Sequence, residues 1–159
     1  MTAKRSQRAS VVMPSELINV EHPFYNSPSV HLAMLKDDVR VIAFKAALEK
    51  LITFNKTTVL EVGTGTGILS LISASLGAKS VIATEAANGM IDICRESFLK
   101  NEIGNHINLI PVDDIEHPPI LPKEIDVIVS ECLGHFAFDE NMITPFPPEN
   151  RHFVFTDRV

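Results

Sequence analysis

The sequence predicts an α/β domain in which a mostly parallel β-sheet is covered by helices on both faces. Short apolar runs rich in β-branched residues alternate with longer segments in which apolar residues recur every three or four positions. The short runs are nearly continuous in apolar residues, as is typical of parallel strands that are buried on both sides. A glycine-rich turn follows the first of these runs, and parallel α/β sheets bind ligands at such strand ends.

Length and composition favour a single soluble domain. The chain has 159 residues, of which 45% are hydrophobic and 21% charged, values that are ordinary for one globular domain. Residues 1–28 are polar and interrupted by prolines, so we expect a partly disordered arm there and the folded domain over 29–159. No apolar run approaches the ~18 residues of a membrane span, so we expect the protein not to associate with a membrane.

Charge and cysteine content narrow the expected partners. The formal net charge of −6 argues against a nucleic-acid partner and is compatible with a cationic one, although acidity often serves solubility alone. Cys94 and Cys132 have no metal-like spacing, so we expect no metal site and no structural disulfide. Residues 1–10 are basic but lack the apolar centre of a signal peptide. These features together predict a cytoplasmic protein.

The first half of the domain alternates helix and strand. Residues 31–51 have the periodicity of one amphipathic helix, whose apolar stripe is Leu32, Leu35, Val39, Ile42 and Ala46. A strand over 57–62 enters the glycine cluster, and the helix that follows has Ile68, Ile72 and Leu76 on one side. Gly77 is expected to cap that helix at its C-terminus.

The second half continues the alternation. Residues 81–84 form the second predicted strand, and Asn88 is expected to cap a helix that buries Met90, Cys94 and Phe98. Strands are predicted over 107–112 and 125–130 and near 153–155, with a loop or short helix over 131–142. Strands alternating with helices in this way favour a parallel sheet.

Acidic residues end three of the predicted strands and point to a ligand site. Glu61, Glu85 and Asp113 hold these positions, and the loop after the first strand is Gly63-Thr64-Gly65-Thr66-Gly67. Glycines there let the backbone turn sharply and approach a ligand closely. The alternatives are an ordinary connection and a nicotinamide dinucleotide site.

The glycine spacing favours S-adenosylmethionine over a dinucleotide. The dinucleotide fingerprint is G-x-G-x-x-G, and Ile68 stands where its third glycine would be. Glu61, two residues before the first glycine, would be unfavourable beside a pyrophosphate but tolerated beside a sulfonium cofactor. In this interpretation Glu85 accepts hydrogen bonds from both ribose hydroxyls, and Asp113 or Asp114 accepts one from the adenine amino group.

Two glutamates leave the fourth predicted strand nine residues apart. Residues 130–142 read Ser-Glu-Cys-Leu-Gly-His-Phe-Ala-Phe-Asp-Glu-Asn-Met, so the pair is Glu131 and Glu140. Together with the glycine loop, Glu85 and the segment 34–40 (Met-Leu-Lys-Asp-Asp-Val-Arg), this pattern resembles the protein arginine methyltransferases, and more closely their bacterial relatives. The resemblance runs from about residue 24 to 159. It implies a Rossmann-like class I methyltransferase fold.

The resemblance also implies roles for individual residues. Arg40 would pair with the cofactor carboxylate and His31 would lie near the site, although nine residues place them on opposite faces of one ideal helix. A break between them is therefore needed if both are to serve. Tyr25 and Met142 would contact the substrate, Tyr25 as the last tyrosine of the family's paired aromatic motif.

The same resemblance implies that Glu131 and Glu140 bind the guanidinium of a substrate arginine, a planar cation that matches carboxylates bidentately. The expected activity is methylation of protein arginine. The alternatives are methyl transfer to another amine or small molecule, and a non-catalytic module that keeps the cofactor site.

The chain departs from the family's pattern in two places. The earlier aromatic positions of the N-terminal motif hold Glu21 and His22. The sequence stops where the family's fifth strand ends, so the last two strands and the C-terminal β-barrel with its dimerisation arm are not in it. We therefore expect a homo- or hetero-oligomer, or a partner chain that supplies the missing part.

Overall fold

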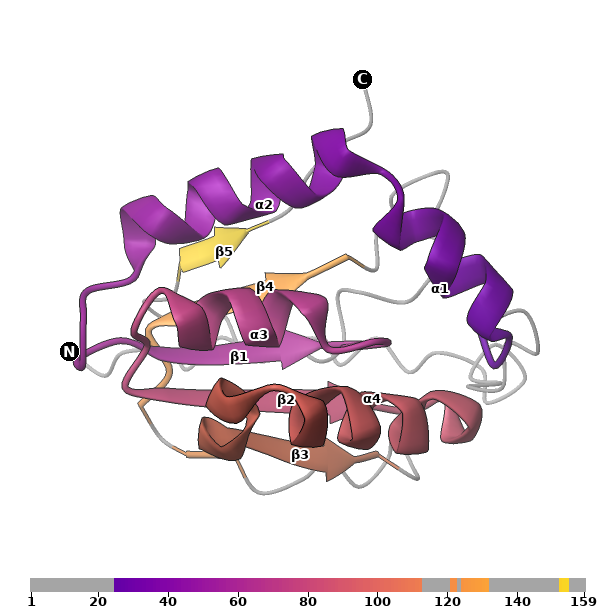
Figure 1. The fold of residues 1–159 in the computed structure, drawn as a ribbon. Coiled ribbons are helices and arrows are strands. Elements are labelled where there is room, and N and C mark those ends of the chain that lie inside the picture. Colours follow the sequence, from indigo (N-terminus) through magenta and orange to yellow (C-terminus); the bar gives the residue numbers. More distant parts are fainter. Residues whose placement is uncertain (1–24, 113–120, 123, 132–151, 155–159) are drawn as a thin grey trace, which may run out of the picture.

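The computed structural model describes residues 25–112, 121–122, 124–131 and 152–154. Their centre is a sheet of five parallel strands in the order β3-β2-β1-β4-β5 (Figure 1). The strands are β1 Thr58–Val62, β2 Ser80–Glu85, β3 Ile107–Pro111, β4 Val127–Ser130 and β5 His152–Val154. The order reverses between β1 and β4, and ligands bind beyond the carboxyl ends of strands at such a reversal.

The helices alternate with the strands as predicted. They are α1 Pro28–Leu35, α2 Asp38–Leu51, α3 Ile68–Ser75 and α4 Asn88–Lys100, followed by the 3₁₀ helix η2 Glu102–His106. The predicted strands are confirmed to within one or two residues at each end. None of the helices in the described ranges is long and apolar enough to cross a bilayer.

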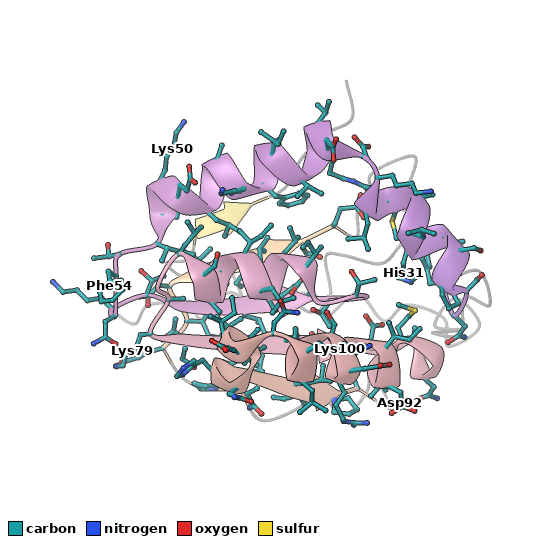
Figure 2. The ribbon with its side chains drawn as sticks, in the orientation of Figure 1. His31, Lys50, Phe54, Lys79, Asp92 and Lys100 are labelled. Atoms are coloured by element: carbon teal, nitrogen blue, oxygen red, sulfur yellow. The ribbon has the colours of Figure 1, made fainter. Side chains whose placement is uncertain are left out.

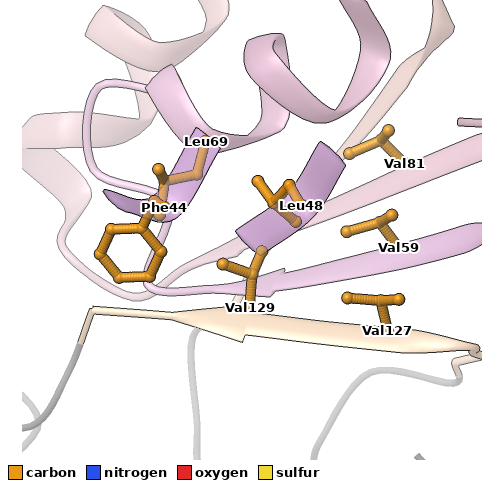
Figure 3. Close-up of a cluster of buried hydrophobic side chains, with 7 residues drawn as sticks. All are labelled: Phe44, Leu48, Val59, Leu69, Val81, Val127 and Val129. Carbon is orange, nitrogen blue, oxygen red and sulfur yellow. The ribbon is translucent and has the colours of Figure 1, made fainter. Parts of the chain in front are cut away.

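The main hydrophobic core lies between the sheet and helices α2 and α3 (Figure 3). It consists of Phe44, Leu48, Val59, Leu69, Val81, Val127 and Val129. Cys94 and Phe98 of α4 pack on the same face of the sheet against Ala83. The opposite face carries Leu60, Ile82 and Ile128, which pack against Ile125. The described residues of this second cluster come from strands and loops, so helical cover of that face stays a prediction.

The predicted single helix over 31–51 is wrong, because the segment forms two helices. The first begins at Pro28, inside the predicted arm, with proline in its first turn, where a missing N–H costs no hydrogen bond. The second begins after Asp37, whose carboxylate accepts a hydrogen bond from the Arg40 N–H at 3.3 Å. This N-cap satisfies a backbone donor that a continuous helix would not leave free. The break that His31 and Arg40 require is therefore present.

The predicted apolar stripe of this segment is also wrong. Val39 is 80% exposed and Ile42 is 64% exposed, whereas α2 buries Phe44 and Leu48 against the sheet. Apolar residues occur around most of α2, so two stripes fit the helical period. Packing against the sheet selects the stripe with the larger Phe44 ring.

Of the two predicted helix caps, the one at the end of α3 is confirmed and the one at the start of α4 is wrong. Gly77 follows α3 with φ +85°, which confirms the predicted glycine at that end. Asn88, by contrast, is the first helical residue of α4, and Ala87 holds the N-cap position. The predicted Asn88 cap is therefore wrong, and a distant residue serves the first turn instead, because the Asn26 Oδ1 accepts the Gly89 N–H at 3.0 Å.

Candidate functional site

The glycine loop turns back over the end of β2. Gly63, Gly65 and Gly67 have φ angles of +70°, +54° and +85°, which side chains of L-residues rarely tolerate. The backbone N–H groups of Gly63 and Thr64 both donate to the Thr84 carbonyl, at 3.0 and 2.9 Å. The loop is therefore held against the neighbouring strand by backbone hydrogen bonds, and its glycines are needed for conformation.

Glu85 ties the loop to the end of β2. One carboxylate oxygen, Oε2, accepts the Gly65 N–H at 2.6 Å, and Oε1 accepts those of Ala86 and Ala87 at 2.9 and 2.8 Å. A carboxylate has about four acceptor positions, so these bonds leave one, on Oε2. Accepting both ribose hydroxyls, as predicted, would require one backbone N–H to release the carboxylate. The side chain is buried beside Gly65.

Glu61 lies beneath the loop rather than on its surface. It is buried, and its Oε2 accepts hydrogen bonds from the hydroxyls of Thr64, at 2.7 Å, and Ser70. Burial raises the pKa of Glu61 to about 7, because the hydrogen bonds from these hydroxyls only partly offset the desolvation, and the like charge of Glu85 raises it further. Glu61 therefore supports the loop from inside. Its direct contact with the cofactor stays a prediction.

Ser70 is a residue of this site that the sequence interpretation missed. It lies in the first turn of α3, is fully buried and donates to Glu61. The signal was a polar residue in an otherwise apolar helix start, three positions after the last glycine of the loop. A buried carboxylate requires such donors, because unpaired buried charge is costly.

Close packing surrounds the loop on the side of α4. A Cβ atom on Gly67 would lie 2.4 Å from the Phe98 ring and 3.2 Å from the Cys94 sulfur. Burial and the nearby Glu61 charge raise the pKa of the Cys94 thiol to about 12. The thiol therefore stays protonated at neutral pH, and its role here is packing.

His31 packs directly on the glycine loop from α1. A Cβ atom on Gly65 would lie 2.8 Å from its Nδ1, so the ring and the loop are in contact. The other nitrogen, Nε2, is 2.8 Å from the Tyr25 carbonyl oxygen. A carbonyl can only accept, so Nε2 carries a proton and, in the neutral ring, Nδ1 is an acceptor facing the loop. The Tyr25 ring lies 6.4 Å from the His31 ring.

The strand ends place these groups at one edge of the molecule. Figure 2 shows His31 at the edge toward which the strands point, while Lys50, Phe54 and Lys79 lie at the opposite edge. The Ser130 hydroxyl donates to the Val62 carbonyl at 2.9 Å, which fixes the end of β4 beside the start of the glycine loop. Glu131 follows immediately. The predicted convergence of Gly65, Glu85 and Glu131 on one edge of the sheet is confirmed.

Arg40 reaches this edge from α2 and contacts Glu131. The distance from its Nη1 to the Glu131 Oε1 is 2.5 Å, and its Nε is 3.8 Å from Asp37. The sequence interpretation placed Arg40 near a cofactor carboxylate and Glu131 near a substrate, and did not connect them. The two residues are 91 positions apart in the chain, so no pattern among sequence neighbours could predict this ion pair.

Four predicted site residues lie outside the described part of the chain. These are Asp113, Asp114, Glu140 and Met142. Their roles stay predictions.

A five-stranded parallel sheet, a glycine loop after β1 and a buried acid at the end of β2 define a class I methyltransferase fold. The family model "Ribosomal protein L11 methyltransferase (PrmA)" matches residues 44–139. The chain belongs to this methyltransferase family.

Within this class, the chain is similar to protein arginine methyltransferases. It is 39% identical to protein arginine N-methyltransferase 1 of Oryza sativa over 137 residues, which are 83% of this chain and 34% of that protein. The crystal structure of Arabidopsis thaliana protein arginine methyltransferase 10 matches with a TM-score of 0.63 and 35% identity, over 71% of this chain and 32% of that one.

A second solved structure gives the same result. A Trypanosoma brucei PRMT1 enzyme–prozyme heterotetrameric complex with AdoHcy matches with a TM-score of 0.61 and 33% identity, over 70% of this chain and 35% of that one. The chain thus spans about a third of the length of these three relatives.

Proposed function

We propose that this chain binds S-adenosylmethionine and transfers its methyl group to the guanidinium of a protein arginine. The observation that carries the proposal is a glutamate bound to a guanidinium beside the glycine loop: Glu131 accepts from Arg40 at 2.5 Å, next to the loop that Glu85 holds. The similarity to protein arginine methyltransferases supports the same activity.

The described residues fit the cofactor. Glu85 faces the glycine loop with one acceptor position left for a ribose hydroxyl, and Arg40 offers a cation for the cofactor carboxylate. The Nη2 atom of Arg40 is buried and has no hydrogen-bond partner among the described residues. A buried donor without a partner is costly, and a ligand carboxylate would satisfy it. When bound, S-adenosylmethionine supplies an electrophilic methyl group on a sulfonium.

The acceptor chemistry depends on the glutamate pair. The acceptor guanidinium has a pKa above about 12 and is not deprotonated in advance. Glu131, with Glu140 outside the described residues, draws its positive charge toward two nitrogens and leaves the third richer in electrons. A bound cofactor would supply its methyl group to that nitrogen, and the proton that the nitrogen carries would pass to water while Glu131 holds the guanidinium in place. Orientation of the reacting atoms supplies much of the rate.

The wider setting belongs to the same proposal. The similarity to a heterotetrameric enzyme–prozyme complex favours assembly with a second chain, homologous or not. A cytoplasmic location is consistent with the free, buried Cys94. The proposed assembly and the proposed location do not affect the argument for the chemistry of the site.

The acceptor is tested by measuring transfer of a labelled methyl group to two peptides that differ only in arginine or lysine at one position. We expect the arginine peptide to react at least about tenfold faster, because lysine lacks the planar fork that two carboxylates can hold. Faster transfer to lysine would favour the amine alternative. Binding of S-adenosylmethionine without transfer to either peptide would favour the non-catalytic module.

A further inference from the structure

Arg40 and Glu131 form an ion pair at the meeting point of two proposed subsites. The pair joins the start of α2 to the end of β4. The Arg40 side chain is only 9% exposed, whereas that of Glu131 is 37% exposed. The glutamate that would hold an acceptor guanidinium therefore already holds a guanidinium of this chain.

The pair leaves Arg40 only partly satisfied. Its Nη1 donates to Glu131, its Nε is 3.8 Å from Asp37, and its Nη2 is buried with no hydrogen-bond partner among the described residues. A carboxylate that received two parallel N–H groups would bind the guanidinium better than this single bond does. A ligand carboxylate that took Nη1 together with the buried Nη2 would therefore compete with Glu131 for Nη1.

We propose that the Arg40–Glu131 pair is an internal latch, in which the guanidinium of Arg40 occupies Glu131 until a cofactor carboxylate draws Arg40 away. This rests on the proposed function, since it assigns the carboxylate to the cofactor and Glu131 to the acceptor. Glu131 then becomes free for an acceptor guanidinium only after the cofactor has bound. The latch makes acceptor binding depend on the amino-acid end of the cofactor.

The latch has a consequence for cofactor affinity alone, which needs no acceptor. Breaking the pair costs free energy, so Glu131 should weaken the binding of any ligand that takes Arg40 through a carboxylate. A ligand without a carboxylate leaves the pair intact, so its affinity does not depend on the energy of breaking the pair. Glu131→Gln keeps the shape of the side chain and removes its charge, so it separates the two cases.

The experiment is calorimetric titration of the full chain with two nucleosides. S-adenosylhomocysteine carries the amino-acid carboxylate, and 5′-methylthioadenosine lacks the amino-acid end. We expect Glu131→Gln to tighten S-adenosylhomocysteine binding about tenfold and to change methylthioadenosine binding less than about twofold. Asp37→Asn is the matched control, because it removes a nearby carboxylate while asparagine still caps α2. It should change S-adenosylhomocysteine binding less than about threefold.

The outcomes separate the latch from the proposed function. Unchanged or weaker S-adenosylhomocysteine binding in Glu131→Gln would overturn the latch and leave the cofactor site standing. Equal tightening of both nucleosides, or an equal effect of Asp37→Asn, would also overturn it, because the effect would then be a general one of charge. Failure of the unmodified chain to bind either nucleoside would overturn the proposed cofactor, and the latch with it.

Discussion

Replacing Glu85 with glutamine is expected to weaken S-adenosylhomocysteine binding at least about a hundredfold, because charge-assisted hydrogen bonds contribute roughly 1.5–3 kcal/mol each. The carboxylate has two functions that an amide cannot combine. It accepts three backbone N–H groups, from Gly65, Ala86 and Ala87, and it is proposed to accept a ribose hydroxyl. Glutamine has one acceptor oxygen, and its NH₂ group would face a backbone donor.

The same substitution should also loosen the loop. We expect urea denaturation of Glu85→Gln to show a loss of about 1–3 kcal/mol in the free energy of unfolding, since a buried N–H would lose its partner. Glu96→Gln is the matched control, because Glu96 is an exposed glutamate on α4 that pairs with Lys100. Affinity that is unchanged in Glu85→Gln would remove this carboxylate from the cofactor site.

The stability of the fold should fall as the pH rises from about 4.5 to about 7, because of Glu61. The folded protein holds the Glu61 proton up to a pKa of about 7, whereas the unfolded chain releases it near the ordinary glutamate pKa of 4.5. The unfolded state therefore binds fewer protons in this interval, and raising the pH favours it. The shift corresponds to about 3 kcal/mol, fully present as stability below pH 4.5 and lost by the time the folded group has ionised.

Glu61→Gln isolates this contribution. Its oxygen still accepts from Thr64 and Ser70, but it does not titrate, so the difference in unfolding free energy between the two proteins should change by about 3 kcal/mol across the interval. Urea denaturation at a series of pH values measures the difference, and other titrating groups cancel in it. Parallel pH profiles for the two proteins would show that Glu61 is ionised in the folded state at low pH.

The strands and the glycine loop could be predicted because their signals are local. The run before Gly63 is rich in β-branched residues, and the acid at position 85 ends the second strand. Parallel strands bring their carboxyl ends to one edge, so the position of Glu131 beside the loop followed from topology. The parts predicted correctly were those that sequence neighbours and strand direction determine.

The parts that failed depend on contacts between distant segments. Periodicity on α2 fits both the stripe with Val39 and the stripe with Phe44, and only the sheet decides between them. Periodicity alone did not show the break before α2, because Asp37 fits a continuous helix as well as a cap. The Arg40–Glu131 pair joins segments far apart in the chain. Predicting the contact between Glu61 and Ser70 would have required knowing that the side chain of Glu61 lies beneath the loop.

A single cofactor site at the carboxyl edge of the sheet is tested most directly by titrating the chain calorimetrically with S-adenosylmethionine and, separately, with NAD. We expect one S-adenosylmethionine to bind per chain and NAD not to bind at the same concentrations, since Ile68 stands where the dinucleotide fingerprint requires glycine. Binding of NAD without binding of S-adenosylmethionine would contradict the assignment of Gly65 and Glu85 to a methyltransferase site.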